Sequence, residues 1–261
     1  MRERRLIFGE VAELYDRHRP SYPPALIDHL VALAGLDGSQ SVLEVGAGTG
    51  KATALFAQRG IPVLAIEPNA EMAAVARRNL AGFEHVTIEE ADFEDWPPRG
   101  RRFALLVSGQ AWHWVTPAVG YAKARDVLAD GGVLAPFWNR AVWEKADIRG
   151  ALLEVYARLG SGLSVDGPMH PANGEAGVDD DWHAQIAAVD GLDDAEVRHY
   201  EWLERYSAAE YVGLLGTASE VRLLSEERRE PFLAAVAQAI ETHGEPVSIP
   251  MRTLLCLARR V

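Results

Sequence analysis

Short apolar runs alternate with segments of helical spacing along the first half of the chain. Five such runs predict strands: 41–45, 61–67, 84–90, 103–109 and 132–139. The segments between them predict three helices: 49–59, 69–82 and 117–129. Strands that are apolar on both faces and alternate with helices are typical of a parallel sheet covered on both sides. The sequence therefore predicts an α/β domain whose strands are joined by right-handed crossovers.

The two flanks of this alternating region carry different patterns. Residues 10–19 predict a short helix, and the prolines at 20, 23 and 24 precede a second helix over 24–35. Gly, Pro, Asp and Asn dominate 160–181, which predicts a loop. Beyond it, strands are predicted at 195–207 and 247–260, with helices between them at 208–216 and 226–243. No parallel crossover of helix length joins these two strands, so we expect an antiparallel pair at the sheet edge.

These elements predict one domain over residues 1–261. We expect it to consist of an N-terminal helical cap, a cofactor-binding core, a helical insertion that caps the substrate, and a C-terminal helix with edge strands. The corresponding boundaries are 1–35, 36–140, 141–220 and 221–261.

Charge and composition narrow the class of partner. The formal net charge of −12 disfavours nucleic acid and anionic membranes, because an acidic surface repels phosphate groups. No apolar run approaches the roughly 20 residues that span a bilayer. The basic N-terminus has no continuous apolar core, so it does not resemble a signal peptide. The single cysteine, Cys256, excludes a disulfide framework. We expect a cytoplasmic protein without membrane contact.

The most informative stretch is the glycine-rich turn 42-VLEVGAGTGKAT-53, which follows the first predicted strand. A nucleotide-binding P-loop requires a glycine at position 45 and a hydroxyl residue at position 52, where this chain has Val45 and Ala52. A dinucleotide fingerprint requires its third glycine at position 51, which is lysine. Both templates fail, and Lys51 is predicted to be a solvated residue in the first turn of the following helix.

An acid stands directly before this turn. Glu44 would repel a pyrophosphate, so the cofactor end nearest the turn is predicted to be neutral or cationic. S-adenosylmethionine (SAM) carries an ammonium group, a sulfonium and a ribose, and no phosphate. The stretch 44-EVGAGTG-50 resembles the first motif of the class I SAM-dependent methyltransferases. The stretches 91-ADFED-95, 108-SGQAWHW-114 and 128-LADGG-132 resemble later elements of the same family, in the same order.

The resemblance implies a Rossmann-like fold with seven strands, SAM as cofactor and S-adenosylhomocysteine as its product. Glu67, at the end of the second predicted strand, would take the ribose hydroxyls. Asp92 would accept from the adenine amino group, and Phe93 would cover the ring. Tyr15 and Arg19 would close over the methionine end. The implied cofactor-binding residues are Tyr15, Arg19, Glu44, Gly46, Ala47, Gly48, Glu67, Pro68, Asp92, Phe93 and Gln110.

Candidate catalytic residues follow the fourth predicted strand. His113 lies at the carboxyl edge of the sheet, where open α/β folds bind ligands. We expect it to line the substrate pocket with Trp112, and a role as general base is the alternative. Tyr15 is a second catalytic candidate, and Trp114 is expected in the core. No metal is expected: the irregularly spaced His170, His183 and the acids at 179–181 are typical of a solvated loop or lid.

The segments 8–23 and 203–219 resemble bacterial small-molecule methyltransferases of the type 11 group. This resemblance implies methyl transfer to a small molecule, with O-methylation first and N- or C-methylation open. Three alternatives remain: a methyltransferase acting on protein or tRNA, a SAM-binding protein without catalysis, and an NAD(P) oxidoreductase, which the glycine spacing disfavours. A monomer or a homodimer is expected.

Overall fold

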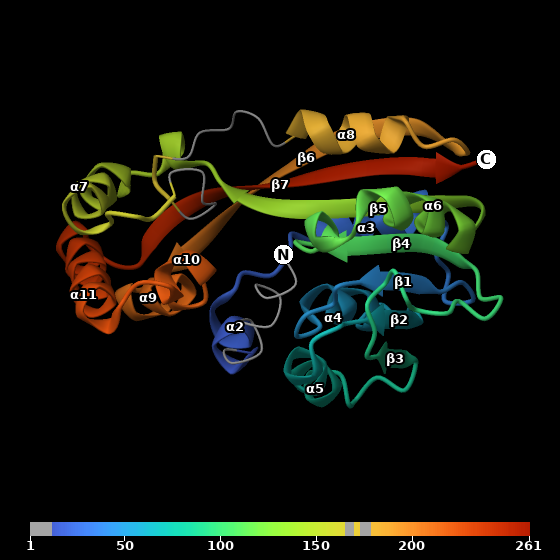
Figure 1. Cartoon of the computed structure of the whole chain (residues 1–261), viewed down its shortest axis with the longest axis horizontal. Helices are drawn as coiled ribbons and strands as arrows, with labels where there is room; N and C mark the ends of the chain where they lie inside the picture. The colour runs from blue at the N-terminus through green and yellow to red at the C-terminus, as the bar shows by residue number, and fades with distance from the viewer. Residues whose placement is uncertain (1–11, 165–169, 173–178) are drawn as a thin grey trace.

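The computed structural model describes residues 12–164, 170–172 and 179–261. Its centre is one seven-stranded sheet in the order β3-β2-β1-β4-β5-β7-β6 (Figure 1). The strands are β1 (Val42–Val45), β2 (Val63–Ile66), β3 (Val86–Glu89), β4 (Phe103–Gly109), β5 (Leu128–Ala141), β6 (Leu192–Tyr206) and β7 (Val247–Arg260). The strands β1 to β5 are parallel, and β7 is antiparallel to both β5 and β6. This confirms the predicted fold class, including the late antiparallel pair.

Helices cover the sheet and extend beyond it. The α-helices are α2 (Ala12–His18), α3 (Pro24–Leu33), α4 (Lys51–Ala57), α5 (Ala70–Asn79), α6 (Pro117–Val127), α7 (Arg149–Leu159), α8 (Asp179–Ala187), α9 (Ala208–Gly216), α10 (Ser219–Arg222) and α11 (Glu226–His243). Two short 3₁₀ helices follow β4 and β5: η2 (Trp112–Trp114) and η3 (Trp143–Lys145).

Local sequence explains where several helices begin. The Asn69 side chain accepts from the backbone N–H groups of Glu71 and Met72, which caps α5 as the sequence predicts. Ser207 and Glu210 form a reciprocal capping box at the start of α9. The strand β1 has all four side chains buried, as expected for a parallel strand with helices on both faces.

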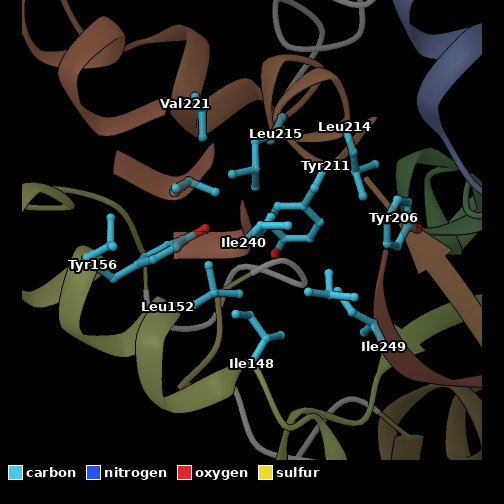
Figure 2. Packing of buried hydrophobic residues seen from close by; sticks show 14 of the residues in the cluster. Ile148, Leu152, Tyr156, Tyr206, Tyr211, Leu214, Leu215, Val221, Ile240 and Ile249 are labelled. Carbon is cyan, nitrogen blue, oxygen red and sulfur yellow. The ribbon is translucent and has the colours of Figure 1, made fainter. Parts of the chain in front are cut away.

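The strands β5 and β7 extend past the parallel part of the sheet. The sequence predicts a strand at 132–139, whereas β5 continues to Ala141 because it pairs there with Met251 of β7. The extended ends lead to α7, α9 and α11 (Figure 1). Buried apolar side chains of these helices form a second cluster. Figure 2 shows that Tyr156, Tyr206 and Tyr211 project into the same cluster. The helices α7, α9 and α11 therefore share one apolar core with the start of β7.

Part of the predicted loop at 160–181 is helical instead. The helix α8 already begins at Asp179 and packs against β6 and β7. Residues 165–169 and 173–178, on which the predicted loop or lid also rests, lie outside the described residues. Within the described part of the chain, every helix is too short or too polar to cross a bilayer.

Candidate functional site

The glycine turn between β1 and α4 is folded onto the protein by its own backbone N–H groups. Gly46 N and Ala47 N donate to the carbonyl oxygen of Ile66, at 2.8 and 3.1 Å. Gly48 N donates to Glu67 Oε2 at 2.7 Å, and Gly50 N donates to Ala47 O at 2.9 Å. These four donors therefore face protein oxygens and not the open side of the turn.

Glycine is required at Gly46 by both backbone angle and space. Its φ is +72°, and a Cβ atom built on it would lie 2.4 Å from the Cβ atom of Ala111. At Gly48 the φ is +58°, but an added Cβ would meet only Tyr15 Cε1, at 4.0 Å. Gly46 thus allows the segment after β4 to approach the turn, and Gly48 leaves open space beside Tyr15.

Glu67 follows β2 and holds the turn. Its Oε2 accepts from Gly48 N, and its Oε1 accepts from Asn69 N at 2.9 Å. Only 7% of the residue is exposed. A carboxylate oxygen has two acceptor positions, so each can take more than one hydrogen bond.

Two adjacent cavities lie at the carboxyl edge of the sheet. The smaller is bounded by the glycine turn, the residues after β2 and β3, and the segment after β4. The larger, of about 830 Å³, extends from the turn toward the helical insertion. Residues shared by both cavities are Tyr15, Gly46, Gly48, Gly109, Gln110 and Trp114. Ligands of open α/β sheets bind at this edge.

The structure brings the predicted cofactor-binding residues to these cavities. The smaller is lined by Tyr15, Gly46, Gly48, Glu67, Pro68, Asp92, Phe93 and Gln110. The larger is lined by Tyr15, Arg19, Glu44, Gly46, Ala47, Gly48, Gln110 and His113. Their assignment to a cofactor stays a prediction.

The ring of Phe93, which is predicted to cover an adenine, packs mainly against core side chains. The residue is 2% exposed, and its ring lies 6.0 Å from that of Trp112 and 6.4 Å from that of Trp96. Phe93 therefore packs into the core with its side chain. Phe93 thus offers little accessible surface to the smaller cavity. Its neighbour Asp92 is half-buried and more accessible there.

The helix α2 brings N-terminal residues to the cavities. The Arg19 guanidinium lies over the Tyr15 ring, with 5.4 Å from its central carbon to the ring centroid. Arg19 Nε also donates to the Thr217 hydroxyl at 2.7 Å, so it joins α2 to the insertion. Burial raises the pKa of Tyr15, which keeps the phenol neutral, so its hydroxyl can donate a hydrogen bond.

Lys51 is not the solvated residue that the sequence predicts. Its Nζ donates to the carbonyl oxygen of Asp16 at 2.6 Å, near the carboxyl end of α2, and the side chain lines the larger cavity. This contact places a cation at a helix C-terminus, where the helix dipole favours it. Lys51 therefore links the cap helix to the start of α4.

Glu44 lies beneath the turn and faces the larger cavity. It is 2% exposed, and its Oε2 accepts from the Thr53 hydroxyl. Burial raises the pKa of Glu44 to about 7, although the hydrogen bond from Thr53 opposes this shift. A bound cation would favour the ionised form, so the predicted attraction to a cationic cofactor end would be coupled to loss of a proton.

Gln110 occupies a strained position directly after β4. Its φ is +59°, a region that residues other than glycine rarely adopt. Its backbone N donates to Phe137 O at 2.9 Å, and its side-chain Nε2 donates to Asn139 O at 3.3 Å. Strain of this kind persists where surrounding contacts over-determine the backbone, often at functional sites.

The two tryptophans of η2 exchange their predicted places. Trp112 is 2% exposed and packs against the ring of Tyr121, with 5.4 Å between ring centroids. Trp114, predicted in the core, lines both cavities. The prediction for Trp112 was wrong because the 3₁₀ turn directs it under the sheet edge, into the apolar cluster on that face.

His113 lines the larger cavity and accepts a hydrogen bond at Nδ1 from Trp138 Nε1, at 3.3 Å. The indole N–H can only donate, so this contact assigns the proton of the neutral imidazole to Nε2. In that tautomer Nε2 cannot take a further proton. A role as general base would require the contact with Trp138 to break.

The histidines of the predicted acidic loop contact backbone groups. Nδ1 of His170 accepts from Ala172 N at 3.1 Å, and Nε2 of His183 lies 3.1 Å from Ala195 O. Among the residues that the structure describes, none form a group of three or more potential metal ligands.

Sequence reasoning missed several residues of the larger cavity. Trp138 and Arg140 come from the end of β5, Trp182 comes from α8, and Tyr22 precedes α3. The position of Arg140 one residue beyond a predicted strand could have identified it, since that edge carries the other site residues. Trp182 lies far along the chain, and no local pattern places it there.

Comparison with known proteins gives consistent matches. A family model described as a methyltransferase domain matches residues 42–132. The uncharacterized methyltransferase Rv3342 of Mycobacterium tuberculosis is 41% identical over 140 residues, which are 53% of this chain and 54% of that protein. The uncharacterized methyltransferase GK2543 of Geobacillus kaustophilus is 32% identical over 161 residues, covering 58% of this chain and 74% of that protein. The chain thus spans about half the length of the mycobacterial relative.

Solved structures share the fold. A protein of Anaeromyxobacter dehalogenans that has been assigned as a type II methyltransferase has a TM-score of 0.64 and 22% identity, covering 93% of this chain and 97% of its own. Phosphoethanolamine N-methyltransferase 2 of Haemonchus contortus, in complex with SAM, has a TM-score of 0.53 and 13% identity. This match covers 97% of the present chain and 56% of the nematode protein.

Proposed function

The chain belongs to the class I SAM-dependent methyltransferases, and we propose that it transfers the methyl group of SAM to a small molecule. The smaller cavity would hold the adenosine part of the cofactor, and the larger cavity would hold the substrate. The two cavities meet at Gln110, Tyr15 and Trp114, where the methyl group would pass. A cytoplasmic location, and a monomer or homodimer, stay predictions.

One observation carries the choice of cofactor: four N–H groups of the glycine turn already donate to protein oxygens. A turn that binds phosphate directs its N–H groups at the ligand. Here those of Gly46, Ala47, Gly48 and Gly50 donate to protein oxygens. The acids Glu67 and Asp92 flank the smaller cavity, so it favours hydroxyl and amino groups over phosphates.

The space beside the turn also suits a ligand that lies flat on the backbone. A Cβ atom at Gly48 would extend into the gap between the turn and Tyr15, where it would have only Tyr15 Cε1 as a neighbour. Glu67 would accept hydrogen bonds from the ribose hydroxyls, and Asp92 would accept from the adenine amino group. Arg19 would pair with the cofactor carboxylate.

When bound, SAM supplies a methyl group that is already activated on its sulfonium. The protein then has to align the acceptor and exclude water, which α2 and the insertion favour by enclosing the cavities. We propose O-methylation first. A hydroxyl acceptor would also have to lose a proton, and the hydrogen bond from Trp138 leaves His113 unable to accept one at Nε2. An acceptor that is already ionised would need no base.

The cofactor assignment predicts a selective binding profile. In calorimetric titrations of the full chain, we expect S-adenosylhomocysteine to bind with a micromolar dissociation constant, and NADH and ATP to give no saturable signal. The reason is that the turn offers a ribose acceptor, while the N–H groups of its three glycines and of Ala47 already donate to protein oxygens. Saturable NADH binding without a response to S-adenosylhomocysteine would contradict the proposal.

A second prediction tests the position of α2 without touching the cavities. A Cβ atom at Gly213 of α9 would lie 2.4–2.5 Å from three ring atoms of His18. Gly213→Ala should therefore displace the His18 ring and, through this ring, shift α2 with Tyr15 and Arg19. We expect a loss of about 1–3 kcal/mol in stability. If about 1 kcal/mol of this loss falls on the binding free energy, S-adenosylhomocysteine binds about fivefold more weakly.

Gly216→Ala is the matched control in the same helix, because its added Cβ would meet nothing within 4 Å. We expect this variant to match the unmodified protein, or to be slightly more stable, in chemical denaturation and in calorimetric titration. Equal affinities in both variants would show that the packing of α9 on α2 does not position the site.

A further inference from the structure

The larger cavity has a positive wall in an acidic protein. Among the residues that the structure describes, its charged lining comprises four cations and two acids: Arg19, Lys51, Arg140, Arg228, Glu44 and Glu220. The chain as a whole carries a formal charge of −12. Burial raises the pKa of both acids, to about 7 for Glu44, which reduces their negative charge. A cleft of one sign attracts ligands of the other.

Three of these cations are held by neutral oxygens. Arg19 contacts the Thr217 hydroxyl, Lys51 the Asp16 carbonyl, and Arg228 the carbonyl of Ser161. Across residues 12–164, 170–172 and 179–261, no carboxylate lies within 4.0 Å of their charged nitrogens. Their positive charge therefore contributes to the potential of the cavity.

Arg140 lies next to Gln110, a residue that lines both cavities. Its Nη1 donates to the carbonyl oxygen of Asn139 at 3.1 Å, and Nε2 of Gln110 donates to the same oxygen at 3.3 Å. The guanidinium group of Arg140 thus lies beside the point where cofactor and substrate would meet.

Buried hydrogen bonds fix this part of β5. Asn139 is 4% exposed, and its side chain donates to Ser21 O at 2.9 Å and accepts from the Thr253 hydroxyl at 2.7 Å. Thr253 in turn accepts from Trp202 Nε1 at 3.0 Å. The carbonyl that orients Arg140 is therefore set by contacts with the N-terminal segment, β7 and β6.

Aromatic surface lies on the same cavity. Trp182 of α8 stacks on Trp138 with 4.8 Å between ring centroids and 25° between ring planes. Trp182 and Trp114 are both half-buried and line the cavity. A substrate with a flat apolar body would bury surface against these rings.

We propose that the methyl acceptor is an acid with an apolar body, and that Arg140 binds its carboxylate or phosphate group. A guanidinium group pairs with either anion through two parallel hydrogen bonds and remains charged when partly buried. This inference rests on the proposed function, because it takes the larger cavity as the substrate site. It adds the substrate class and a specificity-determining residue.

Three probes with one ring system test this assignment: 1-naphthoate, 1-naphthyl phosphate and neutral 1-naphthamide. Each is titrated calorimetrically into the full chain saturated with S-adenosylhomocysteine. We expect at least one anion to bind about 10–100-fold more tightly than the amide, as for a hydrogen bond to a charged group. Which of the two anions binds more tightly distinguishes a carboxylate site from a phosphate site.

The preference for the anion should disappear in Arg140→Met, while binding of the amide stays unchanged. Arg140→Lys should retain part of the preference, since it keeps the charge and loses the planar fork. Arg205→Met is the matched control: Arg205 is exposed on β6 and lies outside the lining of the cavity. It removes the same charge and should leave all affinities unchanged.

Other outcomes overturn the inference. These are equal binding of anions and amide, a preference that survives in Arg140→Met, and absence of anion binding. A fall in S-adenosylhomocysteine affinity in Arg140→Met, with an unchanged melting temperature, would assign Arg140 to the cofactor carboxylate instead. If S-adenosylhomocysteine fails to bind the unmodified chain, the proposed function fails. If it binds and only the anion preference is absent, this inference alone fails.

Discussion

Replacing Gly46 with alanine is expected to destabilise the protein by about 2–5 kcal/mol and to abolish measurable S-adenosylhomocysteine binding. A non-glycine residue at a φ of +72° costs about 1–2 kcal/mol. The added Cβ would also lie 2.4 Å from the Cβ of Ala111, and overpacking of this kind costs about 1–3 kcal/mol. The turn and the segment after β4, which line both cavities, would have to separate.

Gly60→Ala separates these two causes. Gly60 has the same φ of +72°, but a Cβ there would meet nothing within 4 Å, so we expect only the cost of the backbone angle. The double variant Gly46→Ala with Ala111→Gly should recover part of the stability and of the binding, because the clash is removed. Urea denaturation and calorimetry measure both quantities. Equal losses for Gly46→Ala and Gly60→Ala would show that contact with Ala111 does not matter.

Replacing Glu67 with alanine is expected to weaken S-adenosylhomocysteine binding about 10–100-fold, because a charged acceptor for the ribose hydroxyls is lost. The same change removes the acceptor of Gly48 N and of Asn69 N. We therefore also expect the free protein to lose about 1–3 kcal/mol of stability. Glu71→Ala, an exposed acid in the first turn of α5, is the control and should change both quantities little.

The 2′-deoxy form of S-adenosylhomocysteine distinguishes ribose contact from support of the turn. The unmodified protein should bind this ligand more weakly than S-adenosylhomocysteine, and Glu67→Ala should bind the two ligands equally. A difference between the two ligands that persists in Glu67→Ala would place the ribose acceptor elsewhere. Unchanged stability of the free variant would contradict the two hydrogen bonds of Glu67 to the backbone.

Local signals were sufficient for many elements. The helices predicted at 208–216 and 226–243 and the strand at 103–109 coincide with α9, α11 and β4. In α9 the capping box of Ser207 and Glu210 marks the start, and apolar spacing marks the buried face. Such signals depend on residues within one or two turns of each other, so they can be read from the chain. The length of β5 could not, because its last residues are ordered by pairing with β7.

The candidate site divides in the same way. The glycine turn, Glu67 and Asp92 each follow a strand directly, and parallel strands end at one edge of the sheet, so their convergence follows from the order of elements. Which of Trp112 and Trp114 is buried could not be read from the sequence. It depends on tertiary packing, since Tyr121 and Phe93 contact the ring of Trp112. Lys51 has a clear place only once α2 lies across the start of α4.

The sequence by itself determined the family, the parallel core of the sheet and the residues after β1, β2 and β3, because these depend on local motifs and on their order. The tertiary structure alone decided what surrounds the substrate. Arg140, Trp182 and Tyr22 come from segments far apart in the chain, and only the packing of β5, α8 and the N-terminal segment brings them to one cavity. The tertiary structure also decided that N–H groups of the turn donate to Glu67 and Ile66. The direction of these groups depends on hydrogen bonds to the end of β2 rather than on the spacing of the glycines.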